Sequence, residues 1–203
     1  MIIDLAGAAP VHMRVTEKLL PRFFQLLGQG VYLEVQVGCS LKDLLCNQLG
    51  IPTEYVDSRI QTVFLNAKPV DDVAEAVPGP GAVIALSAAM PGLVGAVMRK
   101  GGHYAALRQS ISYGRSSECP AAARSTVRLK LFNLVAAELG PPFLNRGVGI
   151  RGIDFHDFLS RHADAVAQGC IEVKIKGKGV DLNTVGNMAP HQPILLAVTN
   201  AQE

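Results

Sequence analysis

The sequence predicts an α+β protein built from two tandem copies of one small domain, each a mixed sheet with a helix packed on one face. The first observation is self-similarity, because a run of identical residues returns 112 residues further along the chain. These identities pair Val15 with Val127, Lys18 with Lys130, Leu19 with Leu131, Leu27 with Leu139, and Gly28 with Gly140. The second observation is that both halves give one order of elements: strand, short helix, strand, longer helix, strand, turn, strand.

Further identities extend the repeat, and their spacing drifts by a few residues, as loop insertions require. They pair Asp43 with Asp157, Leu45 with Leu159, Ile60 with Ile171, Val70 with Val180, Asp71 with Asp181, and Ile84 with Ile194. The predicted organisation is a leader at 1–12, a first domain at 13–92, a connector at 93–124 and a second domain at 125–203. Domains of roughly 80–90 residues are large enough to bury their own cores.

Local signals place the elements of the first copy. Strands are expected at 13–19, 31–37, 62–65 and 83–86, and a turn at 66–69. A short helix is predicted at 22–27, with Pro21 in its first turn and Gly28 as its C-terminal cap. Ser40 is the expected N-cap of a longer helix at 41–50, which presents several leucines on one face.

The second copy repeats this order. Strands are expected at 126–132, 170–176 and 193–198, and helices at 133–139 and 155–162. Gly140 and Pro141 should end the first helix, and Asp154 should cap the second. A glycine-rich passage stands where the second strand belongs, so we expect this passage to be the most divergent part of the copy.

The repeat also predicts which core positions correspond. On the helix that faces the sheet, Leu41, Leu44 and Leu45 are expected to match Phe155, Phe158 and Leu159. In the strands, Val63 and Leu65 should match Val173 and Ile175, and Ile84 should match Ile194. Burying each such side chain contributes roughly 1.5–3 kcal/mol to stability.

Composition excludes several classes of protein. A formal net charge of +2 is too small to indicate nucleic-acid binding, which needs a concentrated basic face. Cys39, Cys46, Cys119 and Cys170 lack the C-x-x-C spacing of zinc or redox sites, so reduced thiols in a cytoplasmic protein are expected. The N-terminus lacks the features of a signal peptide.

The stretch at 76–98 carries no charge, but its prolines and glycines would break a membrane helix at both ends. We interpret it as a buried strand followed by an apolar loop, and we expect no membrane span. The connector that follows is too apolar for an ordinary linker, and its part at 104–113 suits either a helix or a strand.

The strongest candidate for a functional segment lies in this connector, where basic side chains flank two adjacent glycines. Backbone N–H groups beside such glycines can bind an anion, but the order of residues is not that of a P-loop. A solvated turn, a contact with a partner or anion, and a processing site all remain open. The candidate binding residues are Pro91, Gly92, Arg99, Lys100, Gly101, Gly102, His103, Tyr104 and Arg108.

Two weaker motifs favour structural roles. Gly147, Gly149 and Gly152 have the G-x-G-x-x-G spacing, but no parallel βαβ pattern surrounds them, which favours a flexible loop over nucleotide binding. His156 and His162 are six residues apart and lie on different helix faces, so they do not indicate a metal site with Asp157 and Asp164. No catalytic residue, cofactor or metal site is predicted.

Several segments resemble the ubiquitin-like sulfur carriers, the family that includes the small subunit of molybdopterin synthase and the sulfur carrier of thiamine biosynthesis. Residues 127–140 resemble the opening strand and helix of that family. Residues 40–45, 63–70 and 81–86 resemble its longer helix, third strand and last strand. The resemblance implies two β-grasp domains, each covered over about 80 residues.

The family acts through a flexible tail that ends in Gly-Gly and a free carboxylate, which receives the sulfur. Here the first copy continues beyond Met90, Pro91 and Gly92, and the second ends at Glu203 without glycine. We therefore expect a non-enzymatic binding or assembly module with a protein partner or self-association. The alternatives are a sulfur-carrier precursor cut after Gly92 or Gly102, and a protein that binds a small anion near Arg99, Lys100 and Arg108.

Overall fold

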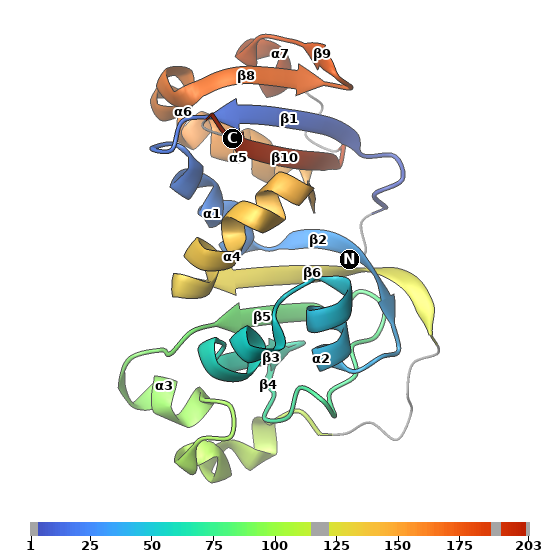
Figure 1. The fold of residues 1–203 in the computed structure, drawn as a ribbon, viewed down its shortest axis with the longest axis vertical. Coiled ribbons are helices and arrows are strands. Elements are labelled where there is room, and N and C mark those ends of the chain that lie inside the picture. Colours follow the sequence, from blue (N-terminus) through green and yellow to red (C-terminus); the bar gives the residue numbers. More distant parts are fainter. Residues whose placement is uncertain (1–3, 115–121, 188–191, 202–203) are drawn as a thin grey trace. The chain divides into compact units, whose positions relative to one another are not determined.

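The computed structural model describes residues 4–114, 122–187 and 192–201 (Figure 1). Helices and strands mix as expected for an α+β protein, and the strand pairs are both parallel and antiparallel. The chain divides into two compact units. Unit 1 comprises Leu33–Val135, and unit 2 comprises the described parts of Ile3–Tyr32 and Ala136–Glu203.

The strands of unit 1 lie in the order β4-β3-β5-β6-β2. The central pair, β5 and β6, is parallel, and β3 is antiparallel to both β4 and β5. Its strands are β2 (Val31–Val37, from Leu33 onward), β3 (Thr62–Leu65), β4 (Lys68–Pro69), β5 (Val83–Ser87) and β6 (Ala123–Phe132). Its helices are α2 (Leu41–Asp43), η2 (Leu44–Gln48), η3 (Tyr55–Arg59), α3 (Gly92–Met98) and η4 (His103–Ile111).

The strands of unit 2 lie in the order β7-β10-β1-β8-β9. Here β1 is parallel to β10 and antiparallel to β8, and β10 is antiparallel to β7. Its strands are β1 (Ala9–Val15), β7 (Val148–Ile150), β8 (Cys170–Ile175), β9 (Lys178–Gly179) and β10 (Ile194–Asn200). Its helices are η1 (Leu20–Phe23), α1 (Phe24–Gln29), α4 (Asn133–Arg146, from Ala136 onward), α5 (Gly152–Arg161), α6 (Ala163–Gly169) and α7 (Leu182–Gly186).

The core of unit 1 follows the predicted apolar pattern. The Ser40 side chain accepts a hydrogen bond from the backbone of Asp43 (3.1 Å), which confirms the predicted N-cap. The helix that follows widens after its first turn, where the Leu49 amide bonds the carbonyl of Leu44, five residues back (3.0 Å). This helix buries Leu41, Leu44 and Leu45 completely.

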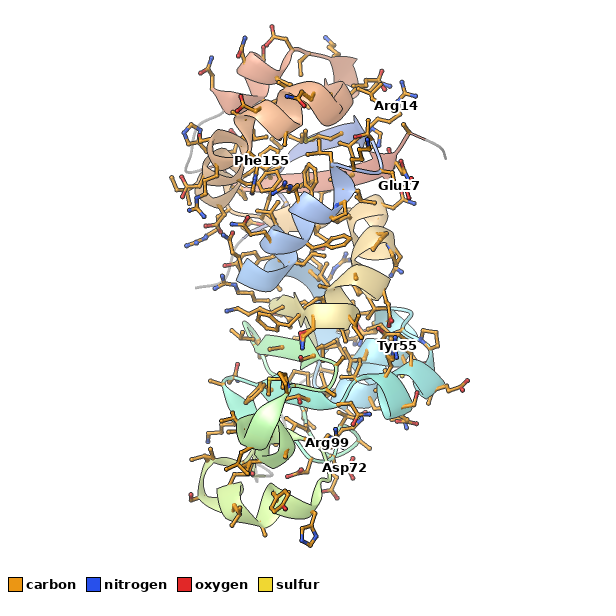
Figure 2. The ribbon with its side chains drawn as sticks, turned by 90° about the vertical axis from the view of Figure 1, so that its left-hand side faces the viewer. Arg14, Glu17, Tyr55, Asp72, Arg99 and Phe155 are labelled. Atoms are coloured by element: carbon orange, nitrogen blue, oxygen red, sulfur yellow. The ribbon has the colours of Figure 1, made fainter. Side chains whose placement is uncertain are left out.

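The core of unit 2 is built around aromatic side chains. Phe155, labelled in Figure 2, and Phe158 are buried side chains of α5. The Phe23 ring packs on Phe158 with centroids 4.7 Å apart. The predicted core positions in both units are buried with two exceptions, Leu159 and Ile175, which are only half-buried.

The first strand begins earlier than predicted, because residues 9–12 of the expected leader form part of β1. Buried Ala9 and Val11 continue the alternation of β1, and Pro10 near its start requires no N–H. Residues 16–19 form a turn in which the Leu19 amide bonds the Thr16 carbonyl (3.0 Å), so the predicted extension of the strand to residue 19 is wrong.

Two predicted helix ends are also wrong. Gly30 with φ of 112°, rather than Gly28, ends α1. Helix α4 continues through Gly140 and Pro141 to Arg146, because Phe143 and Leu144 beyond the prolines are buried and stabilise the added turns. The Gly140 site has a packing role, since a Cβ there would lie 2.9 Å from the Leu27 side chain.

The tandem β-grasp duplication is not confirmed. The predicted domains run consecutively, whereas β6 of the second half belongs to unit 1 and β1 of the first half belongs to unit 2. The strand orders of the two units also differ. In unit 1, β5, the last strand of the first half of the sequence, lies next to β3. In unit 2, the corresponding last strand, β10, is separated from β8 by β1.

Among the helices that the structure describes, none combines the length and apolar character required to cross a bilayer. The uncharged stretch instead forms β5, which is the predicted strand, and the short helix α3, where an apolar loop was predicted.

Candidate interaction surface

The connector forms two short helices, α3 and η4, which pack against each other within unit 1 (Figure 1). Of the two structures open for residues 104–113, the helix is the observed one as far as Ile111, with a kink at Arg108. Gly95 permits the close packing of α3, because a Cβ at this position would lie 1.9 Å from the carbonyl oxygen of Met90.

Arg108 is the central anchor of this segment. It is 2% exposed, and its guanidinium forms a double hydrogen bond to the Asp71 carboxylate, with N–O distances of 3.0 and 2.6 Å. The three other donors reach the Val97 carbonyl (2.8 Å), the Ser112 hydroxyl (2.7 Å) and the Arg99 carbonyl (3.3 Å). All five N–H donors of the arginine are thus used inside unit 1.

Further hydrogen bonds attach the connector to the rest of unit 1. The backbone of Lys100 donates to the Gln61 carbonyl (2.8 Å), and its ammonium donates to the Val56 carbonyl (2.8 Å). The amide of Gly101 donates to the Asp71 carboxylate (3.0 Å), and that of Tyr113 to the Pro69 carbonyl (2.8 Å). Burial lowers the pKa of Lys100, and the nearby carboxylate of Asp57 opposes this shift.

The surface of the connector is apolar. The three most exposed large hydrophobic side chains among the described residues are Leu107 (72%), Leu93 (71%) and Val94 (68%). Ile111 and Tyr104 are also about half exposed. We call Leu93, Val94, Tyr104, Leu107 and Ile111 the connector surface. It inverts the usual arrangement, since apolar groups face outward while a charged group is buried.

The predicted binding residues divide into two groups in the structure. Pro91, Gly92, Arg99, His103 and Tyr104 are exposed, and Figure 2 labels Arg99 among them. Lys100 and Arg108 instead have partners in unit 1, so Arg108 serves as an anchor and is not available to an anion. Asp71 and the four aliphatic members of the connector surface were not among the predicted binding residues, although the apolar content of the connector indicated such a surface.

The adjacent glycines do not form an extended tail. The Gly101 amide is bound by Asp71, and the Gly102 amide bonds the Arg99 carbonyl (3.1 Å), which closes a turn. Cleavage after Gly92 or Gly102 stays a prediction, and intact-mass spectrometry of the protein from its host tests it.

The glycine-rich passage forms the buried strand β7 and the start of α5, so the predicted flexible loop is wrong, and the passage is a close-packing site. A Cβ at Gly149 would lie 2.4 Å from the Leu5 side chain, and β7 passes directly into α5. Arg151 and Asp154 are ion-paired at the start of α5 (2.6 Å from Nε), and the hydrogen bond to Asp154 raises the pKa of Arg151.

The two histidines of the possible metal motif point to different partners. His156 contacts the carbonyl of Gly186 (3.0 Å), and His162 contacts the side chain of Gln25 (2.9 Å). In the described part of the chain, no three histidine, cysteine or carboxylate residues gather closely enough to hold a metal ion.

Cys39 and Cys170 are not activated nucleophiles. Burial raises the pKa of both Cys39 and Cys170, so both favour the protonated form at neutral pH. Cys119 lies outside the described residues.

Comparisons with protein-family models, with curated proteins and with solved structures found no match to this chain. The arrangement of the connector therefore carries the argument about function.

Proposed function

We propose that this protein is a non-enzymatic binding module that docks a partner protein through the connector surface. The observation that supports the proposal is the concentration of exposed aliphatic side chains on one anchored segment of unit 1. Exposed apolar patches of this kind are typical of protein-binding sites.

The anchoring favours a surface that is already formed before the partner arrives. A buried, fully bonded arginine and the contacts of Lys100, Gly101 and Tyr113 fix the backbone of α3 and η4. A fixed surface loses less conformational entropy on binding than a mobile one, which improves affinity.

The charge around this surface indicates the kind of partner. The sequence contains no Asp or Glu from residue 76 to residue 117, and the exposed side chains of Arg99 and His103 flank the apolar groups. We therefore propose a partner with an apolar centre and an acidic rim, since complementary charge guides association.

The test compares three forms of the protein as bait in a quantitative affinity purification from the host. Leu93→Asp combined with Leu107→Asp should lose the specific partner, because burying each leucine contributes roughly 1.5–3 kcal/mol, or about tenfold or more in affinity. Ile171→Asp is the matched control, because Ile171 is 49% exposed and belongs to unit 2. Equal recovery of the same partner by all three forms would refute the proposal.

A further inference from the structure

A second site, independent of the connector, lies in unit 2. A cavity of about 620 Å³ forms where the turn after β1, the end of α6 and the end of β10 meet. Its lining includes Thr16, Lys18, Arg22, Gln168 and Asn200. This volume is in the range of cavities that hold small molecules.

The cavity lies at the carboxyl ends of two parallel strands. Val15 at the end of β1 pairs with Asn200 at the end of β10, so the chain leaves both strands at one edge of the sheet. Gly169 brings α6 against the same turn, because a Cβ there would lie 2.8 Å from the Leu19 Cβ and 3.0 Å from the Thr16 hydroxyl. The Thr16 amide also bonds the Gly169 carbonyl (2.8 Å).

The polar groups at this cavity are unpaired. The charged side chains of Lys18 and Arg22 have no hydrogen-bond or ion-pair partner within the described part of the chain. The Oδ1 atom of Asn200 is buried and likewise lacks a partner. A buried amide oxygen without a hydrogen bond is costly, so a ligand that donates to it gains affinity. Arg108 shows the opposite arrangement, because all its donors are used internally.

The charges specify the chemistry of the ligand. Lys18 and Arg22 give the cavity two cations against one carboxylate, that of Glu17, whose exposed side chain Figure 2 labels. Two adjacent cations suit a phosphate group. The Asn200 oxygen and the Glu17 carboxylate instead require a hydrogen-bond donor, such as a hydroxyl group.

We propose that this cavity binds a small phosphate ester that also carries hydroxyl groups. Lys18 and Arg22 hold the phosphate, and Asn200 and Glu17 accept hydrogen bonds from the hydroxyls. The site differs in position from the predicted anion site near Arg99, Lys100 and Arg108, which lies in unit 1.

Calorimetric titration with ribose 5-phosphate tests the site, with inorganic phosphate and ribose as the comparison probes. Ribose 5-phosphate should bind, and the Kd should rise at least tenfold in the double variant Lys18→Gln and Arg22→Gln. The double variant Arg161→Gln and Lys178→Gln is the control, because it removes two exposed cations elsewhere in unit 2 and should keep the Kd within twofold.

A second variant guards against an effect of Lys18 and Arg22 on folding. Gln168→Glu leaves both cations in place and adds a negative charge on α6, so it should also raise the Kd at least tenfold. Absence of ribose 5-phosphate binding at millimolar concentration overturns the proposal, as does a Kd unchanged in both variants. Equally tight binding of inorganic phosphate overturns the assignment of a hydroxyl-bearing ester.

Discussion

The connector and the segment at 16–23 place their charged and apolar side chains in opposite ways. In the connector, Arg108 is buried while Leu93 and Leu107 are more than two-thirds exposed. In the other segment, Leu19 and Phe23 are buried while Lys18 and Arg22 are exposed and unpaired. Charge alone therefore does not locate a binding site. A cation with all its donors satisfied stabilises the fold, whereas unpaired cations and exposed leucines are available to a ligand or partner.

The largest effect on stability is expected from Arg108→Met, which removes the cation that pairs with Asp71 and the donors to three other acceptors. Because Asp71 is 41% exposed, the cost arises mainly from the five hydrogen bonds lost at the buried guanidinium. At roughly 0.5–1.5 kcal/mol each, their loss should lower the free energy of unfolding by about 3–5 kcal/mol. Urea unfolding measures the loss, and limited proteolysis should cut the connector first. Arg124→Met is the control, because the Arg124–Glu34 pair is exposed and contributes less than about 1 kcal/mol. Equal losses in the two variants would remove the distinction between an anchoring and a surface arginine.

The next largest effect on stability is expected when the buried leucine of the segment at 16–23 is compared with an exposed leucine of the connector. Leu19 is 2% exposed, so Leu19→Ala should lower the free energy of unfolding by about 3 kcal/mol through lost burial and the cavity that remains. Leu107→Ala should change it by less than about 0.5 kcal/mol. Thermal unfolding of both variants measures the difference, and a large loss at Leu107 would show that the connector surface is part of a core.

The smallest expected effect is a change in the pH dependence of stability. It concerns Asp181, which lies outside both segments. Hydrogen bonds from the backbone and hydroxyl of Thr184 lower the pKa of Asp181, the N-cap of α7. Because this pKa is lower in the folded state, the stabilisation is complete above the unfolded value of about 3.9 and disappears as pH falls through the folded value. Urea unfolding below and above pH 4 should show a weaker acid loss in Asp181→Asn than in the wild type. Identical pH dependence would contradict the assignment.

Local signals predicted much of the fold. Ser40 caps its helix, and β3 and β8 lie close to their predicted bounds, because caps and alternation act within a few residues. The exchange of β1 and β6 between the units was not predictable in this way, because strand pairing depends on contacts far apart in sequence. Burial of Phe143 and Leu144 likewise outweighed the helix-ending signal of Gly140 and Pro141.

The candidate site was predicted only in part. The apolar and basic content of the connector located it in the sequence, but Arg108 and Arg99 were both predicted as binding residues. Their difference arises from Asp71, which lies 37 positions before Arg108 in the sequence and removes its charge from the surface. Lys18 and Arg22 had no local signal as a site, since the cavity needs α6 and the end of β10 to complete it.

Photo-crosslinking in the host tests most directly whether the connector surface is a docking site. A photo-crosslinking amino acid is introduced at position 107 in one form of the protein and at position 171 in another, since both native side chains are exposed. Our account predicts a discrete crosslinked species of one partner from position 107 and none from position 171. No crosslink from position 107, or the same species from both positions, would contradict it.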